Sequence, residues 1–128
     1  ENSLGREARE IIVNIMDSFN APAWIHEIDS HQWYLNDSYC KTFNIHRKSF
    51  WTAINIFANA SEVDALEKLK QDIEVYKSGA SIEFTALRQI NAAGPGEPRS
   101  IMCKMIKAPF SVGGRAYIFG RIVEMKDA

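Results

Sequence analysis

Cysteine is scarce in this 128-residue chain, which has only Cys40 and Cys103. Two thiols among apolar neighbours are a poor disulfide framework for a secreted domain, so we expect both to be reduced in the cytoplasm. No apolar run approaches the roughly 20 residues that a membrane span requires, which predicts no membrane insertion of this segment. The opening ENSLGREARE lacks the apolar core of a signal peptide, and the missing initiator Met predicts a longer parent chain.

The chain also lacks an excess of positive or negative charge. The formal net charge is −1, which gives no electrostatic reason to expect a nucleic acid as partner. The patterns G-x-S-x-G and G-x-x-x-x-G-K-(S/T) do not occur, and neither C-x-x-C nor H-x-x-x-H offers a metal site. We therefore expect neither enzymatic activity nor a bound metal. A small α+β isomerase or hydrolase is an open alternative, for which His26 is the sole catalytic candidate.

Apolar residues are plentiful, at 46% of the chain, and many lie in its last thirty residues. Residues 99–107 and 115–126 predict two long antiparallel strands joined by APFSVGG. In this connection Gly113-Gly114 can adopt the positive φ of a tight turn. Pro109 has no N–H to donate, so we expect strand pairing to stop there.

Both faces of this predicted hairpin are apolar. Ile101, Cys103 and Met105 alternate with Met102 and Ile106, so each side of the first strand carries large apolar groups. An antiparallel sheet can leave one face in water, but this one should need cover on both sides.

Residues 5–19 predict an amphipathic helix, because apolar residues recur at three- and four-residue steps. A helix this short is marginal alone and must dock on something. We interpret residues 1–19 as an N-terminal helix and residues 20–128 as the domain itself. The helix packs on its own domain, pairs with a second copy, or does both. Its apolar stripe consists of Ala8, Ile11, Ile12, Ile15, Met16 and Phe19.

The segment after this helix predicts two short strands and a capped helix. The strands are residues 23–29 and 32–35, and the helix is residues 37–43. The side-chain oxygen of Asn36 suits an N-cap, and Asn44 suits the left-handed residue that ends a helix.

Residues 61–78 carry the strongest helical pattern, and Gly79 follows as a natural helix terminator. One or two short helical turns are expected at 47–59, and residues 81–91 alternate as a strand. The resulting order of helix, strands, helical block and strands predicts an α+β fold. The stripe of the long helix consists of Val63, Leu66, Leu69, Ile73 and Tyr76.

The order and spacing of four motifs resemble the PAS domain, the sensory module of histidine kinases, cyclic-di-GMP enzymes and transcription regulators. Residues 36–43, NDSYCKTF, are similar to the family's N-x-x-(F/Y) step from strand to helix. YKSG at 76–79 is similar to its helix end, and KAP at 107–109 to its K-x-P. Residues 113–122 are similar to its closing G-x-x-x-G-I hairpin.

The resemblance covers residues 19–126 and implies a five-stranded antiparallel sheet with helices packed on one face and an N-terminal helix flanking it. At 124–126 the sequence EMK stands where many members carry Asp-Ile-Thr. The resemblance also implies that a cavity, when present, lies between the sheet and the long helix, although the same residues can simply fill each other as core. Mapped by position, its candidate lining is Trp24, His26, Phe43, Trp51, Ile54, Phe57, Leu66, Leu69, Ile73, Phe84, Cys103, Met105 and Phe119.

Two familiar PAS cofactors are disfavoured by these residues. Haem needs an axial ligand, typically a His on or beside the long helix, and residues 61–78 contain no His, Cys or Met. The covalent flavin motif resembles N-C-R-F-L-Q, whereas the corresponding region here reads FWTAINIFAN and has no Cys. We expect no cofactor, and an unidentified small organic ligand is the remaining option.

The resemblance therefore implies a non-enzymatic cytoplasmic sensor that binds a small ligand or a partner. It would relay the signal through its terminal helix and strand to an effector domain in the same parent chain. The alternative is a ligand-free dimerisation module. In either case we expect a homodimer, with interface candidates Ile11, Ile12, Ile15, Met16, Met102 and Ile106.

Overall fold

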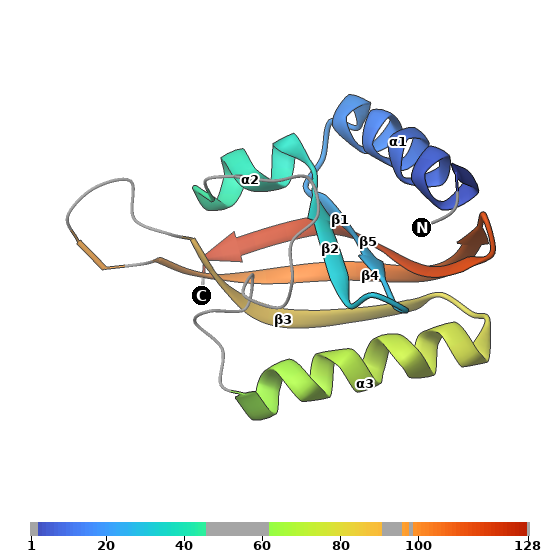
Figure 1. The fold of residues 1–128 in the computed structure, drawn as a ribbon. Coiled ribbons are helices and arrows are strands. Elements are labelled where there is room, and N and C mark those ends of the chain that lie inside the picture. The colour runs from blue at the N-terminus through green and yellow to red at the C-terminus, as the bar shows by residue number, and fades with distance from the viewer. Residues whose placement is uncertain (1–2, 46–61, 91–95, 98, 128) are drawn as a thin grey trace.

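The computed structural model describes residues 3–45, 62–90, 96–97 and 99–127. Figure 1 shows a sheet with α1 and α3 on opposite sides. None of the described helices is long and apolar enough to cross a membrane. In chain order the elements are α1 (Ser3–Ser18), β1 (Ala23–Glu27), β2 (Gln32–Leu35), α2 (Asp37–Phe43), α3 (Glu62–Ser78), β3 (Ile82–Ile90), β4 (Arg99–Val112) and β5 (Arg115–Asp127).

The five strands form one antiparallel sheet in the order β2-β1-β5-β4-β3. The last strand, β5, therefore lies between β1 and β4. This confirms the α+β fold and the five-stranded antiparallel sheet expected from the sequence. The helical turns expected at 47–59 lie outside the described residues.

The β4–β5 hairpin differs from its prediction at one residue. Pairing continues past Pro109, which lies opposite Ile118, and β4 ends only at Val112. The reason is that β3 stops pairing at Lys107, so from there β4 has a neighbour on one side only and the missing N–H costs no ladder bond. The turn itself is as predicted, with positive φ at Gly113 and Gly114.

A β-bulge shifts the β4–β5 register between Lys104 and Met105. Lys104 pairs with Glu124 and Met105 with Ile122, so Val123 is the extra residue. The alternation of sides along β5 therefore changes at this position, because a bulge reverses the side to which later residues point.

Apolar side chains pack on both faces of the sheet, but the cover that the hairpin pattern predicted for the outer face is partial. On the inner face, α2 and α3 pack over a core that includes Trp24, Trp33 and Met105. On the outer face, Ile12 and Met16 of α1 pack on strands β1, β2 and β5. The outer face of β3 and β4 is less covered, since Leu87 and Met102 are exposed.

Asn36 joins the N-terminal helix to the sheet. Its side-chain oxygen accepts hydrogen bonds from the backbone N–H of Ala23 and of Tyr39, which caps α2. Its amide nitrogen donates to the carbonyl oxygens of Met16 and Ala21, at the end of α1 and in the link to β1. Asn36, the predicted cap of α2, therefore also fixes the position of the C-terminal end of α1. Asn44 ends α2 in the left-handed region, as predicted.

Candidate functional site

A buried cluster of polar side chains joins the inner face of the sheet to α3. Asp72 of α3 accepts hydrogen bonds at both carboxylate oxygens: Oδ2 lies 2.6 Å from His26 Nδ1, and Oδ1 lies 2.6 Å from Lys107 Nζ. Lys107 also donates to Gln71 Oε1 at 2.8 Å. We call His26, Gln71, Asp72 and Lys107 the inner-face centre. It ties α3 to β1 and β4 by ionic hydrogen bonds, which are stronger than neutral ones.

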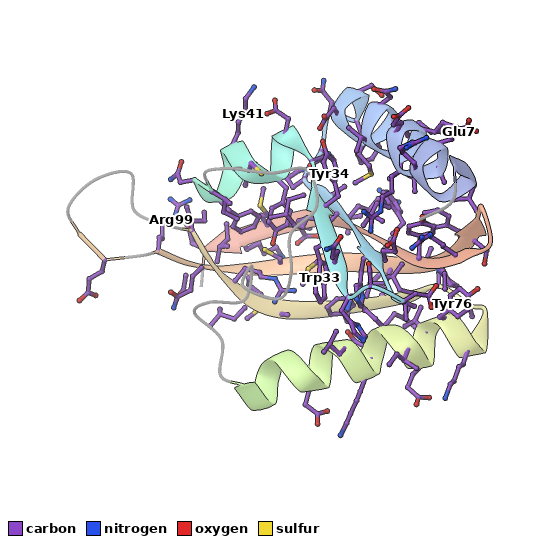
Figure 2. The ribbon with its side chains drawn as sticks, viewed as in Figure 1. Glu7, Trp33, Tyr34, Lys41, Tyr76 and Arg99 are labelled. Atoms are coloured by element: carbon purple, nitrogen blue, oxygen red, sulfur yellow. The ribbon has the colours of Figure 1, made fainter. Side chains whose placement is uncertain are left out.

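Aromatic rings hold the His26 imidazole in place. The ring stacks on Trp33, with centroids 4.0 Å apart and an interplanar angle of 4°. His31, from the turn between β1 and β2, stacks more distantly at 6.0 Å. Figure 2 shows Trp33 on the α3 side of β2 and its neighbour Tyr34 on the α1 side. The imidazole is therefore fixed by packing as well as by Asp72.

The charges of the inner-face centre balance without His26. Asp72 and Lys107 form a buried ion pair, and the ammonium also lies 5.0 Å from the centroid of the Phe84 ring. Burial lowers the pKa of Lys107, and the neighbouring Asp72 carboxylate opposes that shift. A second positive charge on His26 would leave this fully buried group uncompensated, which is costly. A carboxylate can only accept, so Nδ1–H donates to Asp72 Oδ2.

The other ring nitrogen of His26 has no hydrogen-bond partner among the described residues. Nε2 is buried, and no described atom lies within bonding geometry. In the neutral tautomer that donates from Nδ1, Nε2 carries a lone pair and is a hydrogen-bond acceptor. Buried acceptors are normally paired, so an unpaired one needs an explanation.

Sequence reasoning named His26 but missed its partners, although each has a signal in the chain. Asp72 comes three residues after Leu69, which places it on the buried stripe of α3. Lys107 continues the inward alternation of Ile101, Cys103 and Met105 along β4. A charged residue in a buried pattern can be read from sequence, but its pairing with a distant element cannot.

A second buried ionic group lies on the outer face, one residue along β1 from His26. Glu27 Oε2 accepts a hydrogen bond from Arg9 Nε of α1 at 2.9 Å, and Arg9 Nη2 donates to the other oxygen. Ser30 Oγ donates to Oε1 at 2.6 Å, and Arg115 Nη1 of β5 lies 3.3 Å from it. We call Arg9, Glu27, Ser30 and Arg115 the outer-face latch, because it holds α1 on the sheet.

The latch controls the ionisation of its own carboxylate. Burial raises the pKa of Glu27, but the hydrogen bonds from Arg9 and Ser30 and the charge of Arg9 outweigh it, so the net pKa is lowered. Burial and the Glu27 carboxylate raise the pKa of nearby Tyr117 to about 12. Tyr34 Oη adds a second polar tie to α1, at 2.6 Å from Asp17 Oδ2. Sequence reasoning identified none of these contacts.

The structure brings most of the predicted lining residues to the inner face. Trp24, Phe43, Cys103 and Met105 are buried there, and Leu69 and Phe84 pack against them. Ile73 is half-buried on α3. Trp51, Ile54, Phe57 and the side chain of Leu66 lie outside the described residues.

Phe119 does not belong to this set. It packs on the outer face with the α1 core and contacts Phe19 edge-on, with ring centroids 6.2 Å apart. The prediction was wrong because Phe119 points to the outer face of the sheet, like Tyr117. The residues between and after them, Ile118, Gly120 and Ile122, point to the inner face.

The predicted dimer residues fall into two groups. Ile12 and Met16 are buried against their own sheet, at 7% and 3% exposure, so in this conformation they cannot also contact a second copy. Ile11 and Ile15 are 56% and 61% exposed, and Met102 is exposed on the sheet. Ile106 is half-buried.

The inner-face centre contains a His–Asp pair that is closed to solvent. A His–Asp pair can orient a general base, but His26 is fully buried and the other Asp72 oxygen is occupied by Lys107. Among the described residues, no group of three or more His, Cys, Asp or Glu side chains is placed to hold a metal. Burial raises the pKa of the Cys103 thiol, which keeps it protonated and unreactive. The arrangement holds α3 against β1 and β4.

The sequence matches no family model, and no curated protein is significantly similar to it. Solved structures are similar in fold. The PAS domain of Bordetella pertussis BvgS has a TM-score of 0.63 and 15% identity, covering 94% of this chain and 88% of that one. A PAS domain from a two-component sensor histidine kinase has a TM-score of 0.50 and 11% identity, covering 95% and 99%.

The phage VqmA–DPO complex is also similar, with a TM-score of 0.58 and 11% identity. The match covers 93% of this chain but 54% of the VqmA chain, so this chain corresponds to about half of that protein. At these identities the likeness concerns the fold, and the five-stranded sheet and its helices agree with it.

Proposed function

We propose, from the premise that the chain has the PAS fold, that it is a non-enzymatic sensory module of a larger signal-transduction protein. It binds a small ligand or a partner at the inner-face centre and passes the signal to α1 and β5. An effector domain in the same parent chain receives it. The similar structures include PAS domains of sensor kinases, and VqmA in complex with DPO, which supports this class of function for the fold.

One observation carries the proposal: adjacent residues of β1 hold the helices on opposite faces of the sheet. His26 contacts α3 through Asp72, and Glu27 contacts α1 through Arg9. Both side chains are fully buried. A shift of the β1 backbone at His26 would also move Glu27, because the two residues are adjacent in the strand. A ligand that binds one arrangement of the centre better than another would therefore bias how α1 docks.

Hydrogen exchange of α1 tests this relay without any ligand. Asp72→Asn weakens the inner-face centre, and we expect faster amide exchange in α1 even though Asp72 does not touch that helix. Ile101→Ala is the matched control, because it destabilises the inner core and Ile101 takes no part in the hydrogen bonds of the centre. If exchange in α1 rises no more in Asp72→Asn than in Ile101→Ala, relative to the rest of the sheet, the relay does not exist.

A ligand-free dimerisation module is the second candidate, favoured by the exposed Ile11 and Ile15 on α1. It predicts that the domain dimerises and that native mass spectrometry detects no bound or added metabolite. A protein that is stabilised by a metabolite in thermal-shift screening would contradict this second candidate and favour the sensor.

A further inference from the structure

Residues 123–127, at the end of β5, form an open edge of the sheet, which we call the β5 edge. β1 pairs with β5 only as far as Arg121, and next to it the N–H of Ile122 donates to the carbonyl oxygen of Pro22. Beyond this point β4 is the one strand of the described chain that pairs with β5. Figure 1 shows this end of β5 continuing past β1. A strand with unpaired N–H and C=O groups along one side is a template for pairing with another strand.

The side chains of the β5 edge are uncovered as well. Every one of them is exposed, and the apolar Val123 and Met125 are 39% and 40% exposed. Glu124 and Lys126 point to the outer face of the sheet, because Met125 between them pairs with Cys103 of the inner core. This segment contains the sequence EMK, which neither the inner-face centre nor the outer-face latch uses.

The charges of the β5 edge suit a second copy of the same strand. Charged side chains on an open edge usually discourage pairing. Here they favour it, because Glu124 and Lys126 differ in sign and are separated by a single residue. In an antiparallel pair centred on Met125, Glu124 of each copy lies directly opposite Lys126 of the other. Unlike charges in this position stabilise a strand pair, and like charges destabilise it.

The same charges exclude the neighbouring registers. Residues directly opposite each other share a face of the sheet, so a two-fold symmetric pair of strands is centred on a residue. Centring the pair on Glu124 would set two glutamates opposite each other, and centring it on Lys126 would set two lysines opposite each other. Of these registers, only the one centred on Met125 joins unlike charges.

We infer that two copies of the chain pair antiparallel through the β5 edge, in the register centred on Met125. The two sheets then form one continuous sheet, and on its outer face Lys104, Glu124 and Lys126 of the second copy make a row of alternating charge. The contact is short, so the dimer is weak. It is also separate from the exposed side of α1 and requires no ligand, so the inference does not depend on the sensory proposal.

Charge reversal tests this pairing by sedimentation equilibrium of the whole chain. Glu124→Lys and Lys126→Glu each set like charges opposite each other, so we expect each to weaken the dimer about tenfold or more. The double variant Glu124→Lys/Lys126→Glu restores unlike pairs and should dimerise like the wild type. Lys70→Glu is the matched control, because Lys70 is also an exposed lysine that pairs with a carboxylate of its own chain. It should leave the dimer intact.

A mixture of the two single variants provides a second test. Glu124→Lys carries two positive charges on the β5 edge and Lys126→Glu carries two negative ones, so the two variants should prefer each other to themselves. With one of them ¹⁵N-labelled, native mass spectrometry separates the heterodimer from both homodimers. A variant that had only lost stability would not gain such a partner.

Three results would overturn the inference. These are a wild-type chain that stays monomeric at millimolar concentration, single variants that dimerise as well as the wild type, and a double variant that dimerises no better than the single ones. A dimer lost in Ile15→Glu but kept in both charge reversals would assign the contact to α1 instead. The relay is tested separately, by the α1 exchange comparison between Asp72→Asn and Ile101→Ala.

Discussion

Gly120 in β5 has no side chain because the Trp24 indole occupies that space. A Cβ built at Gly120 would lie 2.2 Å from Trp24 Cε2 and Cζ2, well inside contact distance. Trp24 and Gly120 are directly opposite each other in the β1–β5 pairing. The glycine therefore lets the indole lie flat over the neighbouring strand, in the inner core.

Gly120→Ala should lower the free energy of unfolding by about 1–3 kcal/mol, because the added methyl group overpacks the core and displaces the indole. Urea denaturation measures the change. The double variant Gly120→Ala/Trp24→Leu is the control, since the smaller side chain frees the space. If the free energy of unfolding lost in the double variant equals the sum of the two single losses, the two side chains do not compete for the same space.

Asp72→Asn should cost about 3 kcal/mol in urea denaturation. It removes the charge that compensates Lys107, and breaking a buried ion pair leaves an unpaired buried charge. Glu74→Gln is the matched control on the same helix, because Glu74 is exposed and should change stability little. Similar losses in both variants would contradict the burial of this pair.

At the residue scale the sequence predicted what depends on near neighbours. The cap at Asn36, the left-handed Asn44 and the turn glycines follow from local backbone requirements, and the structure confirms them. The sequence did not predict that Asp72 meets His26, which is 46 residues away. Which polar groups meet is decided by how elements pack, and no local pattern encodes it.

Among the elements, α1 depends on one polar contact as much as on its apolar face. Arg9→Met keeps the aliphatic stem and removes two hydrogen bonds to the buried Glu27 carboxylate. We expect a loss of about 2 kcal/mol, and faster amide exchange confined to α1. Arg6→Met is the control, because Arg6 is exposed one turn earlier. Uniformly faster exchange along the whole sheet would contradict a latch specific to α1.

The latch also predicts how acid affects α1. Because the pKa of folded Glu27 is lowered from 4.5, its stabilisation is complete above that value and is lost as the pH falls through the folded pKa. In Arg9→Met the effect of burial is less opposed, so the loss should begin at a higher pH. Exchange of α1 amides as a function of pH measures both midpoints, and identical midpoints would contradict the role of Arg9.

At the element scale the boundaries were predicted best where a residue restricts the backbone. The helix before Gly79 and the turn at Gly113-Gly114 end where their glycines place them. Pro109 misled the prediction, because a proline stops pairing only on the side where its N–H would have been needed. That side is open once β3 has ended, and only the strand order shows this.

For the whole molecule, the exposed side of α1 is the surface on which the homodimer prediction depends. If a second copy packs there, Ile15→Glu should convert a dimer to a monomer in sedimentation velocity, because it places a charge in an apolar contact. Glu10→Lys, which also changes the exposed surface of α1, is the control and should leave the dimer intact. A wild-type monomer at high concentration would contradict the dimer itself.

The sequence predicted the architecture of the molecule because several weak signals agreed in order and spacing. The apolar hairpin required two covered faces, and the amphipathic first helix supplied one of them. The same signals did not separate the sheet-facing residues of α1 from the solvent-facing ones. Ile12 and Met16 face the sheet and Ile11 and Ile15 face solvent, and a wide apolar stripe does not distinguish these two directions.

The neighbouring positions of His26 and Glu27 have a consequence for evolution. A slip of β1 by one residue would turn Glu27 toward Asp72, setting two carboxylates together, and would turn His26 toward Arg9. The shifted pairing would be destabilised by repulsion between the Glu27 and Asp72 carboxylates on the inner face. On the outer face, the Arg9 guanidinium would lose its carboxylate partner. Insertions and deletions of a single residue in this strand should accordingly be eliminated by selection, whatever signal the domain receives.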